Sequence, residues 1–318
     1  MTTSGTSSFT YNRDQIIKMA YRKLGVINAS ETPNAQLIQD ASDALNLWVK
    51  ALNATGLHIW TEEEATLFLQ PNQISYALGG TTTDNCTGSY TATTLAASAA
   101  TNATSINVAS ATGFGSGYYV GVALDSGSIF WTTQSGAASG ATITLAGGLT
   151  GSASSGNPVF VYQTQIIRPL RVVSTRRYNL PSGIDTQMMQ WARIDYRNQP
   201  NKNATGTVTA SFYDPRGGAN TQGILNVWPA PSDATNAVKM TYWRPVQNFT
   251  TSANTPDLPE EWGLCLVWNL AKEMGPEFDV TPNRWAMIKE MAAGHLDNVS
   301  GWDREPESYL FGQDLSQQ

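Results

Sequence analysis

The sequence predicts a multidomain α+β protein. A discontinuous four-helix bundle from both chain ends closes over a central antiparallel β domain, which carries an inserted small β-barrel or β-sandwich. Three observations lead to this fold class. Apolar residues repeat with a helical period over residues 12–56 and 259–296, and the residues between them form short alternating segments separated by turn residues. Within that middle part, residues 86–165 change abruptly to Ala, Thr, Ser and Gly, which indicates a separate β module.

This pattern divides the chain into segments with different expected roles. Residues 1–62 form an N-terminal helical hairpin, which packs with the C-terminal hairpin at 256–297 to make a helical domain. The central β domain comprises residues 63–85 and 166–255, and residues 86–165 form the inserted β domain. Residues 298–318 are expected to be a docking tail that orders when it binds a partner.

The N-terminal hairpin begins with a capped helix. Asn12 is a suitable N-cap and Gly25 a left-handed C-cap for the first helix. The second helix is expected to start at Thr32-Pro33 and to end at Gly56, because a capping hydroxyl followed by proline is typical of a helix start. The apolar stripes of these helices supply the first half of the expected bundle core: Ile16, Met19, Leu24, Leu45, Trp48 and Leu52.

The C-terminal hairpin repeats these signals. Glu260 and Glu261 place negative charge in the first turn of one helix, and Thr281-Pro282 begins another. Their stripes supply the rest of the expected core: Leu264, Val267, Trp268, Trp285 and Ile288. The tail beyond them carries scattered apolar residues that are candidates for docking to a partner: Trp302, Tyr309, Leu310 and Phe311.

The middle of the chain consists of strand-like segments. In the central domain they lie near residues 66–78, 170–173, 208–213, 224–228 and 238–243. In the insert they lie near residues 105–108, 118–124, 129–133, 142–145 and 159–162. Biased composition would also suit a disordered insert, but regular alternation with aromatic residues favours a folded module.

Composition and charge favour an assembled, non-catalytic protein. Charged residues make up 14% of the 318 residues and aromatic residues 10%, which suggests a surface covered by neighbouring subunits. A Ser/Thr-rich β protein kept soluble by neutral polar side chains is the alternative. The net charge of −6 and the absence of a basic run argue against tight capture of nucleic acid.

Targeting and cysteine signals are also absent from the sequence. No stretch suits a signal peptide or a membrane span, so we expect no membrane partner and residence in the cytoplasm until assembly. The two cysteines, Cys86 and Cys265, are too few for a disulfide framework or a Cys-based metal site. We therefore expect no metal and no cofactor.

The residues that could be catalytic, two histidines and three consecutive glutamates, are better explained by structural roles. His58 and His295 have no cysteine or carboxylate cluster at ligand spacing, so packing or capping suits them better than catalysis. Glu62, Glu63 and Glu64 alternate in direction if they lie on a strand, which favours a solvated or partner-facing acidic strip over a catalytic pair. The sequence therefore predicts no enzymatic activity.

Several segments resemble the head-to-tail adaptor proteins of tailed bacteriophages, a family also called connectors, the tail tubular protein A type or packaged-DNA stabilisation proteins. The N-terminal segments that carry the resemblance are Ile17 to Val26, Asp40-Ala41, Asp43 to Asn46, Trp48 and Gly56 to Trp60. The later ones are Tyr178 to Pro181, Leu225 to Pro231, Leu258 to Trp262 and Leu264 to Met274. The insert at 86–165 departs from smaller members of the family.

The resemblance implies a structural virion protein. Such a protein forms a homo-oligomeric ring, typically of twelve subunits, below the portal protein. It extends the DNA channel, meets the tail nozzle or tail tube, and helps to retain the packaged genome, while DNA passes through its lumen without sequence-specific binding. An acidic lumen would repel phosphates and let DNA slide during ejection, and the strip of Glu62, Glu63 and Glu64 is the candidate for such a lumen or for a partner surface.

Two other function classes stay open at this stage. A tail-associated carbohydrate-binding or adsorption module would use the Trp and Tyr side chains of the insert against sugar rings. A polysaccharide hydrolase would need an activity that disappears when one Glu or Asp is replaced. Either would bind or cleave glycans, whereas an adaptor would bind the portal.

Overall fold

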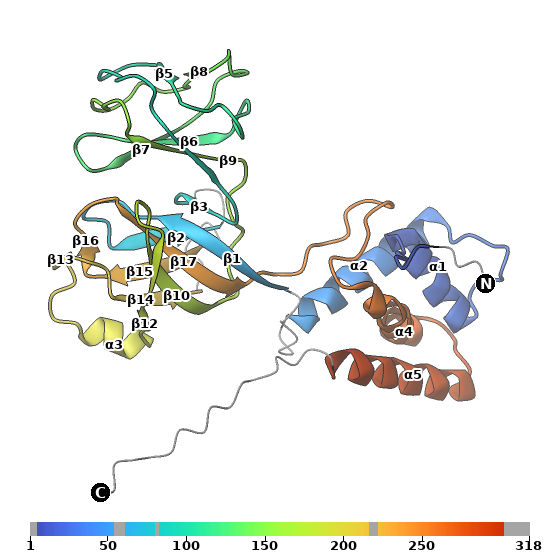
Figure 1. Cartoon of the computed structure of the whole chain (residues 1–318). Helices are drawn as coiled ribbons and strands as arrows, with labels where there is room; N and C mark the ends of the chain where they lie inside the picture. Colours follow the sequence, from blue (N-terminus) through green and yellow to red (C-terminus); the bar gives the residue numbers. More distant parts are fainter. Residues whose placement is uncertain (1–4, 54–60, 80–82, 216–221, 302–318) are drawn as a thin grey trace, which may run out of the picture. The chain divides into compact units, whose positions relative to one another are not determined.

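The computed structural model describes residues 5–53, 61–79, 83–215 and 222–301, and they divide into two compact units (Figure 1). The helical unit contains described residues from both ends of the chain, up to Thr61 and from Pro245 onward. The β unit runs from Glu62 to Arg244. Within the described part, no helix combines the length and the apolar character needed to cross a bilayer.

The helices begin and end largely where local chemistry directs them. Helix α1 spans Arg13–Leu24, with the Asn12 side chain accepting from the Gln15 backbone and Gly25 closing it at a φ of 80°. Helix α2 spans Ala35–Leu52 and is capped by Asn34, so its expected start at Thr32-Pro33 is wrong. The remaining elements of this unit are η2 (Glu260–Trp262), α4 (Gly263–Met274), η3 (Gly275–Glu277) and α5 (Pro282–Ser300).

One hydrophobic core holds the helical unit together. Helix α4 lies at its centre and packs against α1, α2 and α5, so most of its side chains are buried. One of these buried side chains is polar: Asn269 is 1% exposed. Its Nδ2 donates to the carbonyl oxygen of Cys265 at 3.0 Å and to that of Ala292 on α5 at 3.2 Å. This buried amide therefore ties the central helix to α5.

The expected four-helix bundle from both chain ends is wrong. The described residues form 17 strands in five sheets, so sheets outweigh helices. In Figure 1, α4 is seen nearly end-on while α5 lies across the view, so these two helices cross steeply. A bundle keeps its helices close to parallel. Helical periodicity predicts that one face of a helix is buried, but it does not predict which helix covers that face. The prediction of a bundle is wrong for this reason.

Two larger sheets build the central part of the β unit. One has the order β11-β10-β17-β1-β3 and the other the order β12-β14-β15-β2. The strands of the first are β1 (Glu62–Phe68), β3 (Cys86–Thr87), β10 (Arg171–Asn179), β11 (Ile184–Gln187) and β17 (Asn236–Trp243). Those of the second are β2 (Ser75–Leu78), β12 (Met189–Gln190), β14 (Ala210–Asp214) and β15 (Gly223–Trp228). Apolar side chains from both sheets form one core.

Parallel pairs interrupt the expected antiparallel arrangement. Strand β12 runs parallel to β14, and β13 (Thr205–Gly206) runs parallel to β16 (Ala230–Pro231). The short helix α3 (Arg193–Asn198) lies within the expected central β domain, where the sequence analysis predicts no helix. A central domain that is antiparallel throughout is therefore also wrong, because these elements are too short to show a period in the sequence.

Residues 91–162 build sheets of their own. A four-stranded antiparallel sheet has the order β4-β9-β6-β7, and β5 pairs with β8. Their bounds are β4 (Thr91–Thr94), β5 (Ser105–Asn107), β6 (Tyr119–Ala123), β7 (Ile129–Thr133), β8 (Thr142–Thr144) and β9 (Pro158–Tyr162). A separate core of small and branched apolar residues lies among these strands, so this module has its own interior.

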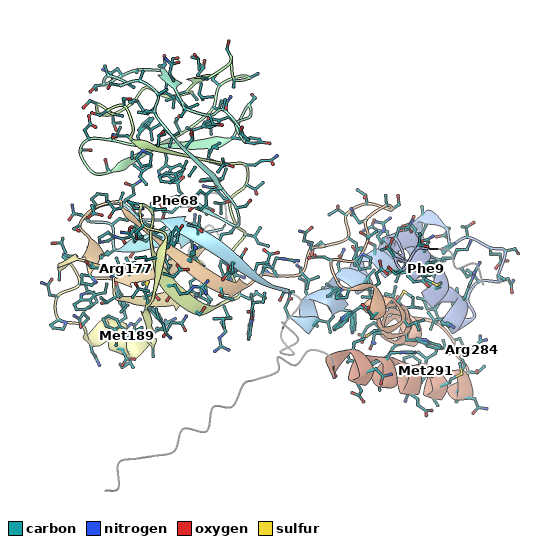
Figure 2. The ribbon with its side chains drawn as sticks, viewed as in Figure 1. Phe9, Phe68, Arg177, Met189, Arg284 and Met291 are labelled. Atoms are coloured by element: carbon teal, nitrogen blue, oxygen red, sulfur yellow. The ribbon has the colours of Figure 1, made fainter. Side chains whose placement is uncertain are left out.

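A cluster of aromatic side chains joins this module to the central sheets. Phe68 at the end of β1 is 1% exposed, and its ring centroid lies 5.1 Å from Tyr90, 5.0 Å from Trp131 and 4.9 Å from Phe160. Figure 2 shows Phe68 between the strands of the module and those of the central sheets. Burial of several aromatic rings at one point is a strong packing contribution, so the module is fixed rather than tethered.

Candidate functional site

The glutamate strip lies on β1 and is largely paired. Glu63 accepts from the Arg244 Nε at 2.6 Å and from the Tyr242 hydroxyl at 3.1 Å, and Glu64 pairs with Arg176. The indole Nε1 of Trp243 donates to Glu62 at 3.1 Å. Because arginines compensate two of the three carboxylates, this strip presents much less negative charge than its sequence suggests.

Burial also shapes the chemistry beneath that strip. Tyr242 is buried, and this burial, with the Glu63 carboxylate as a second cause, raises the pKa of its hydroxyl. The hydroxyl therefore remains a hydrogen-bond donor to Glu63 at physiological pH. The arrangement orders side chains at one end of β1 and β17.

The remaining candidates for chemistry are dispersed. Among the described residues, no three His, Cys, Asp or Glu side chains come together as a possible metal site. His295 lies on α5 against the Trp268 ring, with centroids 6.4 Å apart, and His58 lies outside the described residues. Cys86 and Cys265 are free and buried, and burial raises the pKa of both thiols, that of Cys265 to about 12.

Most residues expected in the bundle core lie inside the helical unit, although that unit is not a bundle. Ile16, Leu24, Leu45, Trp48, Leu52, Val267, Trp268 and Ile288 are buried, and Met19 and Trp285 are partly buried against the same core. The predicted core position of Leu264 is wrong, because this residue of α4 is 54% exposed. It occupies the first turn of that helix, where neighbouring helices leave one side uncovered. The expected docking residues Trp302, Tyr309, Leu310 and Phe311 lie outside the described residues.

Several aromatic side chains of the insert pack against one another. Tyr119 and Tyr162 stack with centroids 4.9 Å apart, and Trp131 lies 5.5 Å from Tyr162 within the cluster around Phe68. Sugar-binding modules need exposed aromatic faces, whereas Tyr162 is buried and the partly buried Tyr119 and Trp131 pack against it. The structure therefore gives no support to sugar binding through these aromatic side chains.

Asp125 is the sole charged residue between positions 86 and 165, and it has a structural role. Its carboxylate accepts from the Ser154 backbone at 2.9 Å, from Asn157 Nδ2 at 2.9 Å and from Ser152 Oγ at 2.9 Å. These hydrogen bonds, the backbone one first, hold the pKa of Asp125 below its usual value. The carboxylate stabilises two loops and is not available as a catalytic acid.

Two exposed apolar surfaces escaped the sequence analysis. On the β unit, Met189 and Ile194 are each 61% exposed, and Met189 lines a concavity of about 880 Å³ together with Trp191 and Val173. On the helical unit, Leu47 of α2 is 73% exposed. The exposure of Leu47 could have been predicted from the sequence, because the helical period places Leu47 opposite the stripe of Leu45, Trp48 and Leu52. The short strands around Met189 carried no such signal.

Comparison with protein families decides the class of this chain. The family model for the SU10 adaptor protein matches residues 127–304, which is more than half of the chain. The chain belongs to this family. It is therefore a phage adaptor, a virion component that joins other parts of the phage head and tail. The matched residues span much of the β unit together with α4 and α5.

Other comparisons add little to the adaptor assignment. No curated protein matches the chain. A solved structure, the Gp54 tailspike of Acinetobacter baumannii bacteriophage AP22 in complex with A. baumannii capsular saccharide, shows 19% identity over 25% of this chain, with a TM-score of 0.22. The adaptor covers 16% of that tailspike chain. A similarity this limited carries no argument about function.

Proposed function

We propose that this adaptor forms a homo-oligomeric ring, of twelve subunits, that joins the portal protein to the tail nozzle or tail tube. The ring extends the DNA channel and helps to retain the packaged genome. It has no enzymatic activity, no cofactor and no sequence-specific contact with DNA. The observation that carries the proposal is the family match over residues 127–304.

The surface chemistry supports assembly. Few side chains are charged, and Leu47, Met189 and Ile194 expose most of their apolar area. Contacts between the subunits of a ring would cover such side chains. The proposed course is synthesis in the host cytoplasm followed by incorporation at the neck of the virion.

The proposal assigns portal docking to the segment after Gly301. Its apolar side chains are Trp302 and, after six residues of which three are acidic, the consecutive Tyr309, Leu310 and Phe311, a composition suited to anchoring in pockets of a larger partner. A net charge of −6 agrees with a channel that does not hold DNA by phosphate contacts.

Removal of residues 302–318 tests this assignment. We expect the truncated chain to lose binding to portal rings of the same phage, measured by co-sedimentation, while its circular dichroism spectrum and melting temperature stay unchanged. A full-length variant with Tyr309→Ala, Leu310→Ala and Phe311→Ala should lose binding as well. A matched variant with Gln313→Ala and Gln317→Ala should bind like the wild type. Portal binding that survives the truncation would refute the docking role of this segment.

A further inference from the structure

The outward face of α2 is apolar at its centre and acidic on one side. Leu45, Trp48 and Leu52 face the core, whereas Leu47 on the opposite side is 73% exposed, the largest exposed fraction of any large apolar side chain in the described residues. Asp43 lies one turn and Asp40 two turns before Leu47, on the same outward face. An exposed leucine beside oriented charges has the composition of an interface anchor.

Neighbouring glutamines hold the two carboxylates in place. Gln36 Nε2 donates to Asp40 at 2.8 Å, and Gln39 Nε2 donates to Asp43 at 3.1 Å. Each pair is separated by four residues, so its members are neighbours on the helix surface. Within the described part of the chain, neither aspartate forms an ion pair. The two negative charges therefore remain uncompensated and directed outward.

The outward face of α1 has the opposite charge. Ile16, Ile17, Ala20 and Leu24 face the core, and Lys18 and Arg22 project from the other side, with the partly buried Met19 beside them. Arg22 is held by the backbone oxygen of Ala29, and no described residue forms an ion pair with Lys18. One subunit thus carries an acidic face and a basic face on consecutive helices.

We propose that the α2 face of one subunit, Asp40, Asp43 and Leu47, binds the α1 face of a second copy of this chain, Lys18, Met19 and Arg22. A two-fold contact of α2 with α2 would bring like charges together, which costs free energy. A contact between two different faces avoids this repulsion and repeats from subunit to subunit, which is the geometry that closes a ring. The proposal rests on the proposed ring and identifies the surfaces that build it.

Disulfide trapping in the full chain tests the pairing. We expect the double variant Asp43→Cys with Lys18→Cys to give a ladder of covalent oligomers under mild oxidation in the presence of portal rings. Each single variant should stay monomeric on a non-reducing gel, and a mixture of the two single variants should stop at dimers. Cys86 and Cys265 are buried and their thiol pKa values are raised, so these native cysteines should not form disulfides in the experiment. Dimers from Asp43→Cys alone would overturn the proposal.

Charge reversal provides an independent measurement. Asp43→Lys alone and Lys18→Glu alone should each weaken self-association at least about tenfold, and combining them in one chain should restore it. Mixing the two single variants should also restore assembly, because each supplies the face that the other needs. Leu47→Ala should weaken association, whereas the exposed leucine on α4 offers a matched control in Leu264→Ala, which should not.

The results separate this proposal from the proposed function. Wild-type chain that binds the portal as a ring, with no trapped ladder and no effect of charge reversal, would overturn the α2–α1 contact and leave the adaptor ring intact. Wild-type chain that neither self-associates nor binds the portal would overturn both. A ladder together with rescue by the paired reversal supports the contact.

Discussion

Phe68→Ala is expected to destabilise the β unit by about 3–5 kcal/mol, the largest effect of a single truncation that we predict. The ring of Phe68 is 1% exposed and contacts three other aromatic rings, from Tyr90, Trp131 and Phe160. Removing it leaves a cavity whose walls belong to two sets of sheets, which makes collapse of the cavity difficult. Urea unfolding followed by tryptophan fluorescence measures the loss, because Trp131 lies at the site.

A second effect of this substitution should be local. Residues 91–162 have their own core, so their amides should stay protected from hydrogen exchange while the amides near Phe68 exchange faster. Phe9→Ala is a suitable control, since Phe9 is 66% exposed on the helical unit (Figure 2), and it should cost less than about 1 kcal/mol. Equal losses for the two variants would contradict the anchoring role of Phe68.

Asn269→Asp is expected to destabilise the helical unit by about 3 kcal/mol or more at neutral pH. The amide of Asn269 donates to the carbonyl oxygens of Cys265 and Ala292, and the residue is 1% exposed. A carboxylate of the same shape can donate to neither oxygen and brings an uncompensated charge into the core. Thermal unfolding by circular dichroism at 222 nm measures the change, since α4 and α5 supply much of the helical signal.

The pH dependence distinguishes the buried charge from a lost hydrogen bond. Burial raises the folded-state pKa of the new carboxyl above its unfolded value of about 4. The deficit should therefore grow as the pH rises from about 4 through the raised pKa, and shrink as the pH falls. Asn269→Ala should show a smaller deficit that does not depend on pH, and Asn283→Asp on exposed α5 surface should show none. A deficit of Asn269→Asp that is constant from pH 4 to pH 8 would contradict this explanation.

Local signals in the sequence predicted the ends of several helices. The cap at Asn12 and the left-handed Gly25 are confirmed, and α5 begins with the proline of Thr281-Pro282. These features depend on backbone groups within a few residues, so the sequence nearby is sufficient to predict them. The start of α2 was wrong by a short distance, because Asn34 competes as a better cap than Thr32.

Tertiary arrangement was harder to predict than local structure. Helix α4 is apolar around most of its circumference, from Leu264 to Leu270, which is typical of a central helix rather than of one member of a bundle. Helix α5 buries only Ile288 and Ala292, which is typical of a covering helix. The prediction of a bundle is incorrect because it treats α4 and α5 as helices that each bury one apolar face of similar width.

The candidate site depended on contacts between residues far apart in the sequence. Pairing of Glu63 with Arg244 and of Glu64 with Arg176 brings together residues from β1, β10 and the end of β17, so no local pattern reveals that the strip is compensated. The same holds for Phe68, whose aromatic partners come from three other segments. Composition, in contrast, can be read without any contact, and the low charge of residues 86–165 is the basis on which the sequence predicts a separate insert.

Imaging of the neck assembly tests the adaptor account most directly. Full-length chain mixed with purified portal rings of the same phage should appear in electron micrographs as an annulus stacked on one face of the portal. End views of that annulus should show rotational symmetry of twelve. Portal rings that stay bare beside unattached monomers, at concentrations well above those of assembly in infected cells, would contradict the account.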